Sequence, residues 1–139
     1  MKFLKKSKEK KKFDDNKKSV FVSSISTMLE IQIVASGKRT IEDTKGIINR
    51  KAIGYIYGFT DCALRSFGQD MSDLSVGIPI LYQILRHLFP NKEETYIQFL
   101  INNQNDDMVL LGMMKGGQQY TEFSKPERKE DVPMGLARC

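Results

Sequence analysis

The side chains best suited to chemistry are Asp61 and Arg65, which lie four residues apart in the stretch Arg50–Phe67. Residues at this spacing share one face of an α-helix, where opposite charges form an ion pair worth a few tenths of a kcal/mol. Gly54 and Gly58 fall beside them and leave room for a groove with the carboxylate at its floor. The spacing favours the ordinary ion pair. The alternative is a ligand-binding site made of Asp61, Arg65, Tyr57, Gly54 and Gly58.

Other residues that catalyse reactions or hold metals lack the partners that such sites need. His87 is the single histidine, and Cys62 and Cys139 form no CxxC pair, so we predict no metal site. The paired carboxylates each fall at an expected helix start, where negative charge is favourable without any catalysis. No serine lies in a nucleophile-elbow sequence. We therefore predict no catalytic residue and no cofactor, and the sequence favours a protein that is not an enzyme.

These residues would be positioned by a helix over Arg50–Phe67. At 100° per residue, its apolar and aromatic side chains cover most of the circumference. Only a narrow wedge remains, which holds Gly54, Gly58, Asp61 and Arg65. A surface helix normally shows an apolar stripe of about 100°. We therefore expect this helix to lie at the centre of the fold, with other helices around it and Phe67 in the core.

The remaining chain predicts about four more helices. Apolar residues recur at three- and four-residue spacings over Val20–Ala35, and again over 78–89, 96–101 and 108–123. Leu29–Ile33 also alternates as a strand does, but one isolated strand would have no partner. Pro79 suits the first turn of its helix or a kink. We predict an all-α, single-domain bundle of about five helices.

The positive charge of the chain lies in a tail. Residues 1–18 contain nine lysines and three acidic residues, whereas residues 19–139 contain 13 Lys and Arg against 14 Asp and Glu. Because the lysine-rich stretch has few apolar residues to bury, we predict a disordered tail over 1–18. A helical domain over 19–123 and a loose charged tail over 124–139 follow. Nucleic acid or an anionic surface would then contact only the N-terminal tail.

The sequence predicts a cytoplasmic protein without a transmembrane segment. No apolar stretch follows the first lysines directly, which disfavours a signal peptide. Val20–Val34 is interrupted by too many polar residues for a span of about 20 apolar residues. Two cysteines without a disulfide framework fit a reducing compartment.

Two pairs of glycines indicate close packing of helices. Gly54 and Gly58 form one GxxxG row, and Gly112 and Gly116 form another. Each interior glycine costs a helix about 1 kcal/mol relative to alanine. We interpret Gly112 and Gly116 as helix-packing residues that face the first row. The alternative is that Gly116 simply ends the last helix.

Three functions stay open at this point. The first is a small cytoplasmic protein that binds another protein or forms a homodimer, because Met108, Met113 and Met114 add to an excess of apolar helical surface. The second is a small-molecule-binding bundle, or an enzyme, with its site near Asp61 and Arg65. The third is a nucleic-acid or membrane-surface accessory protein that acts through the lysine tail.

Overall fold

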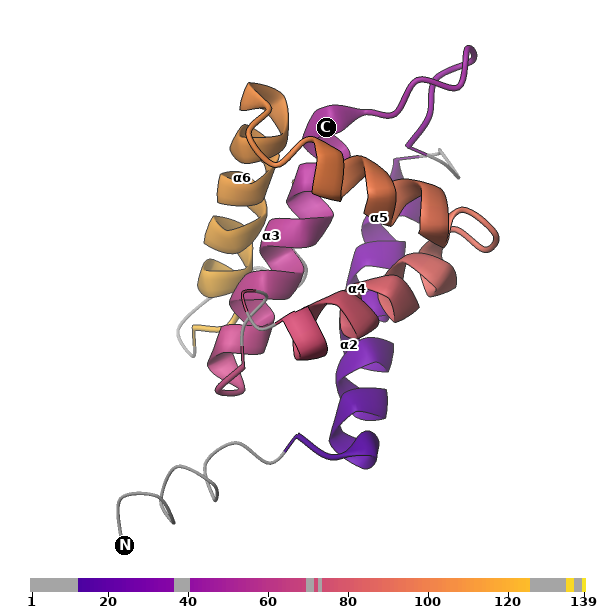
Figure 1. The fold of residues 1–139 in the computed structure, drawn as a ribbon. Coiled ribbons are helices and arrows are strands. Elements are labelled where there is room, and N and C mark those ends of the chain that lie inside the picture. The colour runs from indigo at the N-terminus through magenta and orange to yellow at the C-terminus, as the bar shows by residue number, and fades with distance from the viewer. Residues whose placement is uncertain (1–12, 37–40, 70–71, 73, 126–134, 137–138) are drawn as a thin grey trace, which may run out of the picture.

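The computed structural model describes residues 13–36, 41–69, 72, 74–125, 135–136 and 139 of the chain. Within these residues the fold is all-α, as predicted, with one isolated β-bridge between Glu42 and Ile48. Its five helices are α2 (Asp15–Ala35), α3 (Arg50–Ser66), α4 (Leu74–Leu88), α5 (Glu93–Asn102) and α6 (Asp107–Phe123). Figure 1 shows α6 and α3 side by side, with α4 and α5 on the other side of α3.

Helix α3 lies at the centre of the bundle and packs against α2, α4, α5 and α6. It begins where the Asn49 side chain accepts a hydrogen bond from the Ala52 N–H at 3.0 Å. Side chains around most of its circumference are buried, as the apolar pattern predicted. Phe67 is the exception, because it follows the last helical residue and is 54% exposed. The prediction that Phe67 lies in the core was wrong.

Helix α2 begins four residues before the predicted start of the helical domain at residue 19. The Asp14 carboxylate accepts a hydrogen bond from the Lys17 N–H at 2.8 Å, so Asp14 caps a helix that starts at Asp15. The predicted tail over 1–18 is therefore helical over its last four residues. Residues 1–12 lie outside the described part of the chain.

The same helix continues unbroken to Ala35, which confirms the helical interpretation of this segment and excludes the strand. Phe21, Ile25 and Leu29 turn inward and are buried. Among the helices in the described residues, α2 alone has the length and hydropathy of a membrane span. A core helix can share both properties, and α2 packs on α4 and α3.

Helix α4 starts at Leu74, so Pro79 lies inside it and not in its first turn. Glu42, in the described part of the chain before α3, is held to α5, because the Tyr96 hydroxyl donates to Glu42 at 2.5 Å and Lys92 pairs with Glu42 at 3.1 Å. These contacts fix Glu42 over the start of α5.

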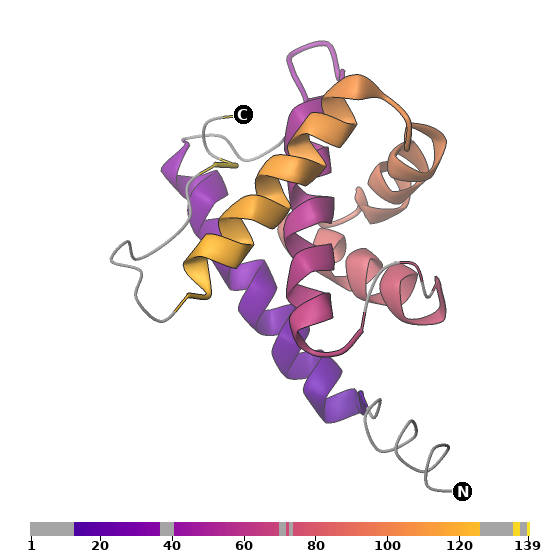
Figure 2. The same ribbon diagram turned by 90° about the vertical axis from the view of Figure 1, so that its left-hand side faces the viewer.

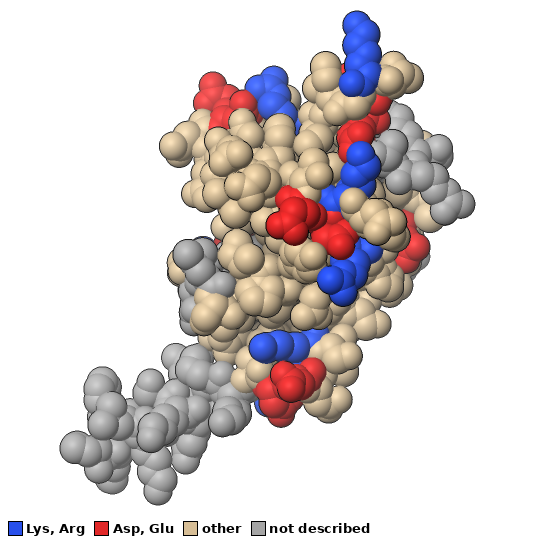
Figure 3. Space-filling model, turned by 45° about the vertical axis from the view of Figure 1, so that its right-hand side comes forward, with Lys and Arg blue, Asp and Glu red and all other residues tan. Residues whose placement is uncertain are grey.

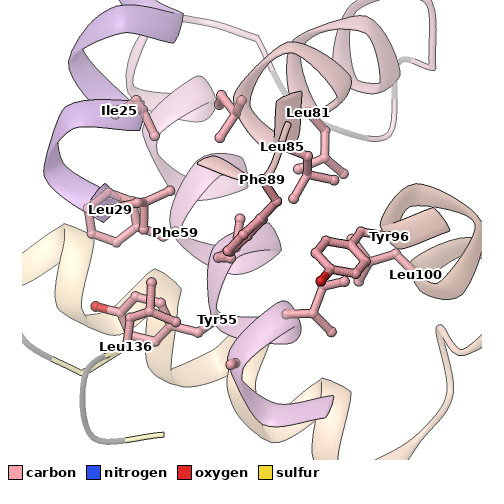
Figure 4. Close-up of a cluster of buried hydrophobic side chains, with 14 of the residues drawn as sticks. Ile25, Leu29, Tyr55, Phe59, Leu81, Leu85, Phe89, Tyr96, Leu100 and Leu136 are labelled. Carbon is pink, nitrogen blue, oxygen red and sulfur yellow. The ribbon is translucent and has the colours of Figure 1, made fainter. Parts of the chain in front are cut away.

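The core gathers large side chains from all five helices and from the end of the chain. Figure 4 shows Ile25, Leu29, Tyr55, Phe59, Leu81, Leu85, Phe89, Tyr96, Leu100 and Leu136 within it. Leu136 is 6% exposed although it belongs to the predicted loose tail over 124–139. The described end of that tail is therefore packed against the fold, while residues 126–134 lie outside the described part.

Candidate functional site

Both glycine rows lie in the contact between α3 and α6, within one chain. A Cβ atom on Gly54 would fall on the backbone of Val109, and one on Gly58 on the backbone of Met113. Figure 2 shows how α6 crosses directly over α3. Helix α6 therefore covers the wedge of the central helix at Gly54 and Gly58.

The second glycine row, Gly112 and Gly116 of α6, packs against the backbone of α3 in the same way. A Cβ atom on Gly112 would fall on the Lys51 carbonyl oxygen, and one on Gly116 on the Tyr55 carbonyl oxygen. Because neither row carries side chains, the two backbones can touch. Helix α6 continues past Gly116 to Phe123, so the alternative that Gly116 ends the helix is wrong.

Four of the five predicted ligand-binding residues meet at one surface depression of about 250 Å³. The depression is lined by Tyr57, Gly58, Asp61, Cys62, Arg65, Met113, Met114 and Gly117. Gly54, the fifth predicted residue, lies under Val109 and does not line it. The structure thus brings most of the predicted set together, beside α6.

The charged groups of this depression already bind each other. Arg65 Nη2 lies 3.2 Å from Asp61 Oδ2, and Arg65 Nε donates to Asp61 Oδ1 at 3.4 Å. This is the ion pair that the four-residue spacing favoured. A ligand that used the carboxylate would have to compete with the guanidinium.

Other charged groups also occur as pairs of opposite sign. Arg50 lies 2.6 Å from Asp106, and Arg86 lies 3.5 Å from Glu93. Figure 3 shows basic and acidic side chains alternating along a band on one face, beside a wide area without charge. Neither sign dominates this face, so it offers no extended basic surface to a phosphate backbone. Within the described residues, no three His, Cys, Asp or Glu side chains gather as a metal site would require.

The outer face of α6 is a site that sequence reasoning found only in part. Leu110, Leu111 and Met114 are exposed there, although the opposite face of α6 is buried against α3. The methionines were noted as surplus apolar surface, but the leucines were not. The signal was the run Met108–Leu111, because four consecutive apolar residues cover a whole helical turn and cannot all face one neighbour.

Two exposed charges lie on either side of this apolar centre. Asp107 precedes Leu111 by four residues, and Lys115 follows it by four. Each step of four residues is one turn plus about 40°, so all three side chains project from the same face. Neither Asp107 nor Lys115 forms an ion pair with another described residue of the chain.

Comparisons of the chain with protein-family models, curated proteins and solved structures found no match. No relative therefore assigns a role to the depression at Asp61 or to the outer face of α6. The choice between the two sites depends on their exposure, charge and packing.

Proposed function

We propose that the protein acts by self-association, as a cytoplasmic homodimer formed through the outer face of α6. The observation that carries this proposal is the exposure of Leu110, Leu111 and Met114 on a helix that packs on α3 with its opposite face. Large apolar side chains gathered at the surface mark interaction sites more often than isolated ones do. Such a function requires no catalytic group.

A second copy fits this face because the charges on it are complementary to themselves. Consider two antiparallel α6 helices related by a two-fold axis that passes through Leu111. A residue that precedes Leu111 by some number of positions in one copy then lies opposite the residue that follows Leu111 by the same number in the other copy. Asp107 of one copy then lies opposite Lys115 of the other, and this contact occurs twice. Met108 lies opposite Met114 in the same way. A two-fold interface of this kind is the commonest among soluble oligomers.

A single substitution at the centre of the face tests the proposal. Leu111→Asp would place two carboxylates on the two-fold axis, where they repel each other and lose water. Because Leu111 is 40% exposed and points away from α3, the helix content of the single chain should not change. We expect light scattering after size exclusion to give about twice 15.9 kDa for the wild type at high micromolar concentration, and 15.9 kDa for the variant.

Ile31→Asp is the matched control, since Ile31 lies on α2 and is 44% exposed. This variant should remain dimeric. A wild-type mass of 15.9 kDa would contradict self-association, and dimers of the Leu111→Asp variant would place the interface elsewhere. Loss of the dimer in both variants would mean that association depends on general apolar exposure and not on α6.

A small-molecule site at Asp61 is the second candidate, supported by the depression that Tyr57, Asp61 and Arg65 line together. It has weaker support, because the Asp61 carboxylate already accepts hydrogen bonds from Arg65. The third candidate, an accessory role through the lysine tail, stays a prediction because residues 1–12 lie outside the described part of the chain.

A further inference from the structure

Gly135 and Leu136 contact Gln32 of α2, Tyr55 of α3 and Gln119 of α6, and we call the place between these three side chains the crevice. The Gly135 N–H donates to Gln119 Oε1 at 2.7 Å, and the next N–H, that of Leu136, donates to Gln32 Oε1 at 2.8 Å. Gln119 belongs to α6 and Gln32 to α2. Two side-chain amides from helices far apart in the sequence thus bind two consecutive peptide groups.

The helices themselves also hold these two side chains, Gln119 by a hydrogen bond and Gln32 by burial. The Tyr55 hydroxyl donates to Gln119 Oε1 at 2.7 Å. Burial raises the pKa of Tyr55 to about 12, so this hydroxyl keeps its proton and remains a donor at neutral pH. Gln32 is fully buried, and its Nε2 has no hydrogen-bond partner among the described residues. A buried amide is costly unless its polar atoms are used, and the Leu136 N–H uses the oxygen.

The crevice selects the side chains of the segment as well as its backbone. A Cβ atom on Gly135 would collide with Gln119 Oε1 and would lie 2.7 Å from a ring carbon of Tyr55. A larger residue at this position would therefore have to displace the end of Gln119 and the buried ring of Tyr55. Leu136 fills the apolar part of the crevice, and Figure 4 shows its side chain beside Tyr55.

Cys139 makes hydrogen bonds with Gly135 and Leu136. The Cys139 N–H donates to the Leu136 carbonyl at 3.1 Å, and the Cys139 thiol donates to the Gly135 carbonyl at 3.3 Å. The Asn49 side chain, at the start of α3, donates to the Cys139 carbonyl at 3.3 Å. Each of the three described residues of this segment, Gly135, Leu136 and Cys139, therefore has a hydrogen bond to the helical part of the fold.

We infer that this crevice is a peptide-binding site specific for a Gly–Leu segment, and that Gly135 and Leu136 of the chain itself occupy it. The segment is held by one apolar side chain and a few hydrogen bonds, so it can leave while the helices stay folded. The stretch 126–134, which joins it to α6, reads PERKEDVPM and is rich in charge and proline. The inference rests on the contacts of Gly135 and Leu136 and does not depend on self-association.

Binding of a free peptide tests the inference. The full chain carrying Leu136→Asp should release its own end, because a carboxylate cannot replace the buried leucine. A fluorescein-labelled peptide with the sequence of residues 133–139 and Cys139→Ser should bind this chain, measured by fluorescence anisotropy. It should bind the wild-type chain at least tenfold more weakly, since the tethered segment competes at a local concentration of roughly millimolar.

The matched control is the same peptide with Gly135→Ala, which should not bind. The inference is overturned if the wild-type peptide fails to bind a Leu136→Asp chain with wild-type helix content. It is equally overturned if both chains bind the peptide alike, or if the Gly135→Ala peptide binds as tightly. If Leu136→Asp fails to fold, the full chain with Gly135→Ala replaces it, because that change disturbs only the close approach to Gln119 and Tyr55.

Discussion

At the scale of single residues, Gly116 and Gly117 are neighbours at which an alanine substitution should have different effects on stability. A Cβ atom on Gly116 would fall on the backbone of Tyr55, whereas one on Gly117 would meet nothing closer than 3.6 Å. Gly116→Ala should therefore lower the free energy of unfolding by about 1–3 kcal/mol or more, because the α3–α6 backbones must separate. Gly117→Ala should leave it unchanged or raise it by up to about 1 kcal/mol through helix propensity.

Urea unfolding followed by circular dichroism measures both effects under the same conditions. The two substitutions add the same methyl group to adjacent helical positions, so each controls for the other. Equal changes in the free energy of unfolding for the two variants would show that the glycine rows do not set the distance between α3 and α6.

Single residues also show what the sequence could not predict. The spacing of Gly54 and Gly58 indicated close packing, but a projection of one helix cannot tell which neighbour covers its polar wedge. For that reason the ligand-binding set included Gly54, which α6 covers. The Asp61–Arg65 pair was predictable because both partners lie within one turn of the same helix.

At the scale of elements, the start of α2 carries a prediction about the N-terminal segment. The Phe13 ring lies 5.9 Å from the Phe21 ring and 6.4 Å from the Phe67 ring, and Asp14 caps the helix. Removing residues 1–18 would delete this aromatic contact and the cap, which is worth about 1 kcal/mol by itself. We expect this deletion to lower the thermal midpoint by several degrees.

Removal of residues 1–12 alone is the control, because it keeps Phe13 and Asp14. The expectation from the sequence was different, since it placed the whole of residues 1–18 in a tail that contributes nothing to the core. Thermal unfolding followed by circular dichroism distinguishes the two expectations, because only one of them has a lower thermal midpoint for the deletion of residues 1–18. Equal midpoints for both deletions would show that Phe13 and Asp14 contribute nothing to stability.

Local sequence patterns predicted the helices well, because nearby residues determine where a helix forms and where it begins. The apolar periodicity located all five helices, and Asp106 caps α6 where its acidic start was expected, accepting hydrogen bonds from Met108 and Val109. The docked end of the chain was missed because its partners are distant. Gln32 and Leu136 lie 104 residues apart, and no local pattern connects them.

At the scale of the whole molecule, the sequence predicted an all-α bundle around a central helix but not which helix would be peripheral. That distinction decides the proposed function, since α6 packs almost entirely on α3 and leaves its other side exposed. Hydrophobicity alone could not show it, because Val109 and Leu111 are equally apolar while the first is buried and the second exposed. The two residues differ in exposure because α3 packs against the face of α6 that carries Val109 and not against the face that carries Leu111.

An exchange of charges tests the antiparallel register of the proposed dimer. Lys115→Asp would place a carboxylate opposite Asp107 of the second copy at both symmetric contacts. Asp107→Lys would likewise place two ammonium groups together. Exposed ion pairs are worth about 0.2–1 kcal/mol each, so changing two attractions into two repulsions should weaken dimerisation by on the order of tenfold. The dissociation constant from sedimentation velocity at low salt measures this effect.

The double variant Asp107→Lys, Lys115→Asp should restore the wild-type dissociation constant, because each new charge again meets its opposite. Lys125→Asp makes the same charge change just beyond α6 and should have little effect, since Lys125 lies 14 residues from the two-fold axis at Leu111. Added salt should reduce every one of these differences, because the charges are exposed. In a parallel arrangement each residue would lie beside its own copy, so like charges meet in the wild type and in both single variants, and neither single substitution would weaken the dimer. Unchanged dissociation constants for the single variants, or failure of the double variant to recover, would therefore exclude the antiparallel register, even if Leu111→Asp abolishes the dimer.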